Sequence, residues 1–126
     1  DIPADEFFVS LFETALNSGE IVTSVSFSVP DKAGWSKFAN LASRFAIVAV
    51  MVSSQGGAVR VAVTGAKDCV FRVSEMEQAL SDDFSPSAIK GINVAADNLN
   101  DDHYADAEYR AHLITVMAKR AVAACS

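Results

Sequence analysis

The residue types that most often bind metals or catalyse reactions are few in this chain of 126 residues. The two histidines, His103 and His112, are nine positions apart, whereas a pair of histidine ligands on one helix face is usually one turn apart. Asp101 and Asp102 precede His103, and such an acidic cluster is typical of a solvated loop that caps a helix. We therefore predict no metal site.

Nucleophiles and phosphate-binding loops are not indicated either. Cys69 and Cys125 are far apart and lack the spacing of a metal or redox motif, so we interpret them as reduced thiols of a cytoplasmic protein. The paired carboxylates Asp82 and Asp83 are typical of a loop, and Gly56-Gly57 is typical of a hairpin turn rather than of a nucleotide loop. The sequence thus contains no self-contained active site, which favours a domain that works as part of something larger.

Composition excludes two further classes of function. Ten Lys and Arg stand against 16 Asp and Glu, a net charge of −6, so the clustered cations that nucleic acids require are not expected. The longest apolar run, residues 45–52, is shorter than the roughly 20 residues of a membrane helix. The N-terminus has no basic segment of the kind that begins a signal peptide. With 51% hydrophobic residues, one domain with a real core is predicted.

Alternating apolar residues predict strands in the first part of the chain. Residues 1–19 suit either an amphipathic helix or an irregular arm, and their dense aromatic residues require something to pack against. Residues 20–29 alternate apolar residues with Ser and Thr, which predicts a half-buried strand ended by Pro30. The further strands that we expect are short ones near 35–38 and 70–73, a central strand at 45–53 covered on both faces, and its hairpin partner around 59–63.

Three helix starts follow in the second part. Ser74 and Glu77 have the spacing of a capping box, and Ser85-Pro86 is a second start signal. The longest helix is expected over residues 107–123, capped by Asp106 or, alternatively, by Asp102. Strands followed by helices predict an α+β fold, a small antiparallel sheet of three to four strands with about three helices on one face.

Arg110 is the exception on the longest helix. At about 100° per residue it lies in the apolar arc beside Ile114 and Met117, where an unpaired charge is costly. We expect it to pair within the domain or at its edge, with Asp102 or Asp106. An anchoring ion pair at a domain or subunit interface is the alternative.

Several stretches along nearly the whole chain resemble one protein family. Phe7-Phe-Val-Ser-Leu-Phe-Glu-Thr-Ala-Leu16 followed by Gly19-Glu-Ile-Val22 is similar to a segment that leaves an FAD-binding domain. The strands at 42–50, 59–66 and 70–72, and the helix Ala107-Glu-Tyr-Arg-Ala-His-Leu113 with Lys119-Arg-Ala121, resemble the domain that follows it. Together they resemble the C-terminal domain of the flavoprotein (medium) subunit of molybdenum hydroxylases, the carbon monoxide dehydrogenase and xanthine dehydrogenase group.

The resemblance implies a role inside a larger oxidoreductase. In this family a molybdopterin part oxidises the substrate, [2Fe–2S] clusters relay electrons and a flavin passes them on. Residues 1–19 would be the tail of an FAD-binding lobe, and residues 20–126 an accessory α+β domain. That domain would pack on the FAD-binding lobes and support electron transfer from iron–sulfur clusters to flavin. It would have no activity alone and no FAD on this fragment, because the pyrophosphate loops belong to the lobes. Molybdopterin and iron–sulfur subunits are the further partners implied.

The resemblance also implies candidate site residues. Arg44 and Ile47 are expected to face the flavin, although xanthine dehydrogenases have a lysine at the position of Ile47, and ordinary core packing is the alternative. Arg110, Phe7 and Phe8 are candidate interface or structural anchors. A different class of function remains open beside this one, a free-standing α+β module that binds a small ligand or a protein.

Overall fold

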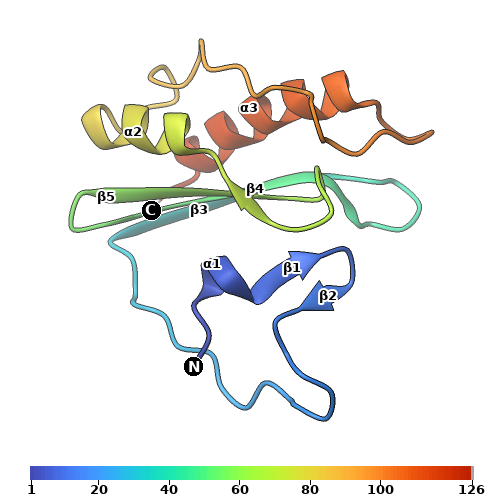
Figure 1. The fold of residues 1–126 in the computed structure, drawn as a ribbon. Helices are drawn as coiled ribbons and strands as arrows, with labels where there is room; N and C mark the ends of the chain where they lie inside the picture. The colour runs from blue at the N-terminus through green and yellow to red at the C-terminus, as the bar shows by residue number, and fades with distance from the viewer. Residues whose placement is uncertain (126) are drawn as a thin grey trace.

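The computed structural model describes residues 1–125. The packed part of the chain is built on a four-stranded antiparallel sheet. Two helices, α2 (Ser74–Asp82) and α3 (Ala107–Ala123), cover one face of this sheet (Figure 1). The predicted α+β class is confirmed. The strands follow the chain in the order β3 (Lys32–Ala39), β4 (Ala46–Gln55), β5 (Ala58–Thr64) and β6 (Phe71–Arg72).

A tight turn joins the two central strands. Gln55 pairs with Ala58, which leaves Gly56 and Gly57 as the two turn residues. Both glycines have positive φ, +56° and +84°. A two-residue hairpin turn of type I′ requires positive φ at both of its central residues. The hairpin predicted from this Gly-Gly pair is therefore confirmed.

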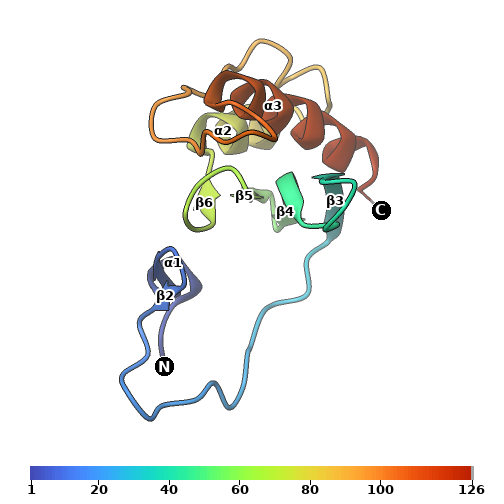
Figure 2. The same ribbon diagram turned by 90° about the vertical axis from the view of Figure 1, so that its right-hand side faces the viewer.

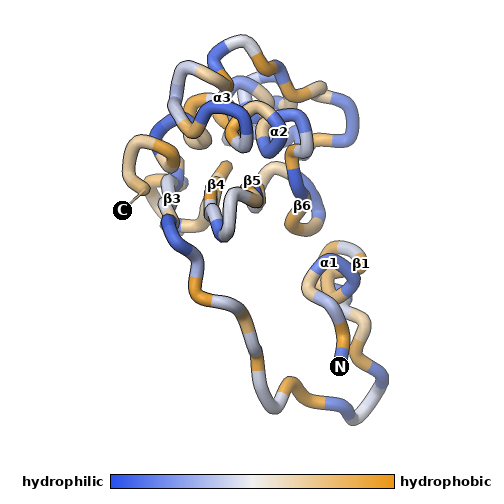
Figure 3. The backbone as a smooth tube through the Cα atoms, turned by 90° about the vertical axis from the view of Figure 1, so that its left-hand side faces the viewer, coloured by the Kyte–Doolittle hydropathy of each residue, from blue (hydrophilic) through white to orange (hydrophobic). Residues whose placement is uncertain are grey.

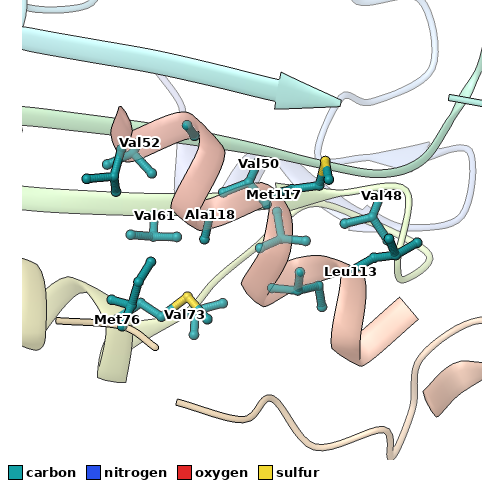
Figure 4. Close-up of a cluster of buried hydrophobic side chains, with 14 of the residues drawn as sticks. Val48, Val50, Val52, Val61, Val73, Met76, Leu113, Met117 and Ala118 are labelled. Atoms are coloured by element: carbon teal, nitrogen blue, oxygen red, sulfur yellow. The ribbon is translucent and has the colours of Figure 1, made fainter. Parts of the chain in front are cut away.

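The hydrophobic core lies between the sheet and the two helices (Figure 4). Alternate residues of β4 and β5 point toward the helices, and each such valine that is fully buried contributes about 1.5–3 kcal/mol. Helix α3 comes so close to β3 that a Cβ on Gly34 would collide with the carbonyl oxygen of Ala121. The buried side chains include Val48, Val50, Val52, Val61, Val63, Met76, Leu80, Ile114 and Met117.

The opposite face of the sheet is open. Residues 45–53 were predicted as a central strand covered on both faces, and β4 is central. On the side away from the helices, however, Met51 is 38% exposed and Trp35, its neighbour on β3, is 50% exposed. Figure 2 shows the helices on one side of the sheet and the N-terminal segment on the other. The prediction that this strand is covered on both faces is wrong, because no described element packs on the open face of the sheet as the helices do on the other face.

The N-terminal part forms a small arm and an extended linker. The arm has a one-turn helix, α1 (Ala4–Phe7), and a hairpin of β1 (Phe8–Ser10) and β2 (Glu13–Thr14). Residues 15–31 form neither helix nor strand, so the strand predicted over 20–29 is wrong. Its alternating pattern is present, as the hydrophobic colouring along the linker shows (Figure 3), but it has no neighbouring strand to pair with and residues 20–29 are exposed.

The helix starts were predicted with mixed success. Asp106 caps α3 as expected, its Oδ1 accepting from the Tyr109 amide at 2.7 Å. The capping box at Ser74 is wrong, because Glu77 is used elsewhere and no side chain caps α2. Residues 86–91 after Ser85 form successive turns instead of a helix. Within residues 1–125, no helix has the length and hydropathy to cross a membrane.

Candidate functional site

A shallow hollow of about 210 Å³ lies where the β3–β4 loop, the end of β5 and the segment before α3 meet. Two of the predicted site residues, Ile47 and Arg110, are brought together in it. These two residues are 63 positions apart in the chain, and no sequence pattern links them. Other side chains at this hollow are Asn40, Phe45, Asn100 and Tyr104.

Ile47 occupies an irregularity in the central strand. Phe38 pairs with Val48, but the next residue of β3, Ala39, pairs with Ala46, so β4 has one extra residue at Ile47. The extra residue of such a bulge does not take part in the regular hydrogen bonds between the strands. The Ile47 carbonyl oxygen instead accepts a hydrogen bond from Arg110 Nη1 at 2.7 Å. The side chain of Ile47 is half-buried and also packs against the core.

Arg110 is the buried cation of the hollow, with 4% of its surface exposed. Its Nε donates to the Ala105 carbonyl at 3.2 Å, and its Nη1 donates to the carbonyls of Ile47 and Gly65 at 2.7 and 3.2 Å. Its Nη2 donates to Asp102 Oδ2 at 2.8 Å. These bonds use four of the five N–H groups of the guanidinium, so the charge is paired and well satisfied despite its burial.

Asp102 holds both Arg110 and the turn before α3. Its Oδ1 accepts from the backbone amides of Tyr104 and Ala105, at 2.9 and 3.1 Å. The amide of Tyr104 is the main cause of a lowered pKa of Asp102; burial acts against it, and the amide of Ala105 and the charge of Arg110 add to it. Asp102 is therefore an aspartate at neutral pH, and pairing of Arg110 within the domain, with Asp102 as one of the two predicted partners, is confirmed.

Gly65 and Asn100 complete the backbone part of the hollow. Gly65 has a φ of +84°, and a Cβ there would lie 2.5 Å from the Ala46 carbonyl oxygen. Asn100 Nδ2 donates to the Gly65 carbonyl at 3.2 Å, and the Asn100 amide donates to the Ala66 carbonyl at 2.8 Å. Neither role was predicted from the sequence, because a single glycine or asparagine outside a motif does not show which backbone groups it will meet.

The remaining predicted site residues lie outside the hollow. Arg44 is exposed in the β3–β4 loop with a φ of +64°, and its carbonyl accepts from Lys37 Nζ at 3.3 Å. Phe7 and Phe8 lie in the arm, where their rings pack edge to face with centroids 5.1 Å apart. The proposed flavin contact of Arg44 and the anchoring role of the two phenylalanines stay predictions.

Aromatic and amide side chains surround the hollow. Phe45 and Tyr104, which are 79% and 58% exposed, offer aromatic surface beside the amide groups of Asn40 and Asn100. In residues 1–125, no three His, Cys, Asp or Glu side chains are close enough together to hold a metal ion. A larger hollow of about 380 Å³ lies on the outer surface of α3, beside Lys90 and Lys119, and contains none of the predicted site residues.

The chain has structural relatives but no match at the level of sequence families. No protein-family model matches it, and no curated protein is similar enough in sequence to match. The structure of reconstituted CO dehydrogenase from Oligotropha carboxidovorans superimposes with a TM-score of 0.76 at 21% identity, covering 98% of this chain and 49% of that chain. A cyanide-inactivated Cu,Mo-CO dehydrogenase gives 0.70 at 22% identity, covering 98% and 47%. This chain, which spans about half the length of the solved chains it matches, therefore has the fold of part of a carbon monoxide dehydrogenase chain.

Proposed function

We propose that this chain is the C-terminal accessory domain of the flavoprotein subunit of a molybdenum hydroxylase of the carbon monoxide dehydrogenase group. In this proposal it packs on the FAD-binding lobes of the same subunit and supports electron transfer from iron–sulfur clusters to flavin. It has no activity alone, and it works beside molybdopterin and iron–sulfur subunits in a cytoplasmic enzyme. The observation that carries the proposal is the fold match over 98% of this chain but only 49% of its structural neighbour.

The hollow around Arg110 fits one wall of a flavin site but not a whole one. Phe45 and Tyr104 provide exposed aromatic surface for a planar ring, and the described residues leave one N–H of the Arg110 Nη2 group unused. A pyrophosphate needs a cluster of backbone amides or cations, and the hollow has one cation that Asp102 already neutralises. FAD bound by neighbouring lobes would supply the electron-accepting chemistry.

The residues of this chain have a positioning role in that arrangement. Arg110 ties the bulged strand at Ile47, the end of β5 at Gly65 and the turn at Asp102 into one rigid unit. Rigid elements position a binding surface more accurately than loops do. The Arg110 bonds thus hold the wall of the hollow in place, and the exposed aromatic side chains are the groups available for contact with a ring.

Binding of FAD to the chain by itself tests the accessory role. We expect weak binding or none when FAD is titrated into the chain and flavin fluorescence is followed. Stoichiometric binding in the submicromolar range would contradict the proposal. The coding sequence upstream of Asp1 gives a second check: about 150–180 further residues with glycine-rich loops are expected, a usual size for such lobes. A start codon directly before Asp1 would favour the free-standing module.

A matched pair of substitutions in the longer protein tests the hollow. Phe45→Ala removes aromatic surface that is 79% exposed at the hollow, and Leu41→Ala removes a side chain that is 90% exposed in the same loop. Neither change should affect folding, because both side chains are exposed. We expect Phe45→Ala to lower the flavin content after purification and Leu41→Ala to leave it unchanged. Equal flavin content in the two variants would contradict a flavin wall at this place.

A further inference from the structure

The segment from Ile21 to Val29 has the residue pattern of a strand but no strand beside it. Four of its five odd-numbered residues are apolar, and three of its four even-numbered residues are Ser. A strand of this kind normally buries its apolar face and leaves its serine face to solvent. Here the apolar side chains of the odd-numbered set, Ile21, Val25, Phe27 and Val29, are 79–82% exposed. The segment therefore presents a complete apolar face that nothing in the described chain covers.

The backbone of this segment is extended and its amides are free. Residues 21–30 contain no turn or bend. Among residues 1–125, none of the nine amides from Ile21 to Val29 donates a hydrogen bond. The segment contains no Gly, no Pro and no charged residue, and its Ile, Val, Thr and Phe residues favour strands. An extended apolar run with unpaired amides is a template for pairing with another strand.

Hydrogen bonds fix both ends of the segment. Before it, the Asn17 amide donates to the Glu20 carboxylate at 2.6 Å, and the Glu20 amide donates to the Asn17 carbonyl at 3.0 Å. After it, the Asp31 amide donates to the Ser54 carbonyl at 2.8 Å, and Asp31 Oδ2 accepts from the Gly56 amide at 2.7 Å. Figures 1 and 2 show the segment between these ends on the side of the sheet opposite the helices. It is thus held at its ends and unpaired along its length.

The chemistry of the segment selects the kind of partner. Burial of Val25 and Phe27 also removes water from the backbone between them, and buried N–H and C=O groups need hydrogen-bond partners. A groove lined by side chains would cover the apolar face but leave the backbone groups unpaired. The edge strand of a β-sheet supplies both the hydrogen bonds and an apolar layer beneath the sheet. Pro30 then ends the added strand, because proline has no N–H to donate.

We propose that residues 21–29 add as a strand to the edge of a β-sheet in the preceding lobe of the same subunit, which moves the start of the α+β domain from residue 20 to Pro30. The superposition covers 98% of this chain, and hence most of the segment, but only 49% of the solved CO dehydrogenase chain. The extended segment is thus part of the shared fold, and about half of the solved chain lies outside the match. The inference rests on the proposed function, which supplies the preceding lobe.

Hydrogen exchange of the nine amides is the direct measurement. In the longer subunit at least every second amide from Ile21 to Val29 should exchange at least about 100-fold more slowly than in this chain by itself, because one side of an added strand is bonded to the sheet. In this chain by itself, all nine should exchange as fast as in an unfolded peptide. Fast exchange of all nine in a longer subunit that retains its flavin would overturn strand addition and leave the proposed function intact. A gene product with no preceding lobe would overturn both.

Two neighbouring substitutions test which face of the segment is buried. Val25→Asp puts a charge on the apolar face, and Ser26→Asp puts the same charge on the serine face one residue later. In the longer subunit, Val25→Asp should restore the fast exchange of residues 21–29, whereas Ser26→Asp should leave the slow exchange unchanged, because successive side chains of a strand point to opposite faces. Equal effects would contradict a strand with a buried apolar face. In this chain by itself, both variants should have the urea midpoint of the unchanged chain, because both side chains are exposed.

Two measurements on this chain by itself test the partner and the boundary. Protection of residues 21–29 that appears as the protein concentration rises from about 1 to 100 µM would assign the segment to a second copy and overturn the proposal. A chain that begins at Val29 retains the Gln55 contact to the Val29 carbonyl and the bonds of Asp31. It should unfold at the same urea concentration as the unchanged chain. A lower midpoint would show that the deleted residues belong to the packed domain and would contradict the boundary at Pro30.

Discussion

Two arginines of this protein make ion pairs in different surroundings. Arg110, 4% exposed in its side chain, donates to Asp102 and to three backbone carbonyls between α3 and the sheet. Arg72, 36% exposed in its side chain, donates to Glu77 and Asp5 at the sheet edge. The first cation links segments that the sequence separates by up to 63 positions, and the second links β6 to the next helix and the arm.

The difference shows where such a network affects stability. A buried carbonyl that loses its donor cannot turn to water, whereas a group at an exposed edge can. Ion pairs at the surface are also weakened by solvent. We therefore expect a ranking in which changes around Arg110 cost the most, changes at Glu77 cost less, and changes at Asp5 cost little.

Removal of the buried guanidinium should have the largest effect. Arg110→Met keeps most of the volume of the side chain but leaves the buried Ile47 carbonyl without its donor and removes one of the two donors of the Gly65 and Ala105 carbonyls. We expect the free energy of unfolding to fall by about 2–4 kcal/mol, measured by urea denaturation. Asp102, whose side chain is 42% exposed, regains water and should not add to the loss. A loss below about 0.5 kcal/mol would mean that Arg110 is not a structural anchor.

The second-largest loss of stability is expected at Gly65, whose carbonyl accepts a hydrogen bond from Arg110. Gly65→Ala combines a positive φ with a Cβ 2.5 Å from the Ala46 carbonyl oxygen, and should cost about 2–3 kcal/mol. Gly57→Ala has the same φ of +84° but nothing within 4 Å, and should cost about 1 kcal/mol. The free energy of unfolding of each variant is measured with urea. The difference between the two values gives the cost of the close contact between a Cβ at position 65 and the Ala46 carbonyl. Equal losses would show that the β4 bulge can move aside.

Glu77 should give an intermediate effect that depends on pH. Burial raises the pKa of Glu77, but the hydrogen bonds from Arg72 and from the Val61 amide outweigh it and hold this pKa below the usual value of 4.5. The folded state therefore favours the carboxylate, and the stability from this group is present above pH 4.5 and is lost as the pH falls through the lowered pKa. Glu77→Gln should cost about 1–2 kcal/mol at pH 7.

The pH profile gives the check on that interpretation. The difference in the free energy of unfolding between the unchanged chain and Glu77→Gln should shrink as the pH is lowered below 4.5. A constant difference down to pH 2 would show that the Glu77 charge does not contribute, and that the variant is destabilised by changed packing alone.

The smallest effect is expected at the arm. Asp5→Asn removes the ion pair to Arg72, in which the two side chains are 66% and 36% exposed. The free energy of unfolding should change by no more than about 0.5 kcal/mol, because exposed pairs contribute little. A loss above about 1 kcal/mol in urea denaturation would show that the arm stabilises the packed domain, and the ranking of the two arginine regions would need revision.

Sequence patterns located the elements whose partners are close in the chain. Valines at alternate positions around a Gly-Gly pair predicted the β4–β5 hairpin, and Asp106 before an apolar helix pattern predicted α3 with its cap. The same alternation over residues 20–29 predicted a strand that does not exist. An extended segment becomes a strand only when another strand supplies its hydrogen bonds, and periodicity alone does not show whether one is near.

The candidate site, like the fold, could be predicted from the sequence only in part. Sequence by itself determined that Arg110 lies on the apolar side of its helix and needs a partner, because helical spacing sets the direction of a side chain. The sequence offered Asp102 or Asp106 as the acidic partner, and the tertiary structure selected Asp102. Only the tertiary structure added the carbonyls of Ala105, Ile47 and Gly65, since two of these come from distant strands and are freed by a bulge and a strand end. Hydrogen bonds to a backbone carbonyl have no sequence signature, because every residue has that acceptor.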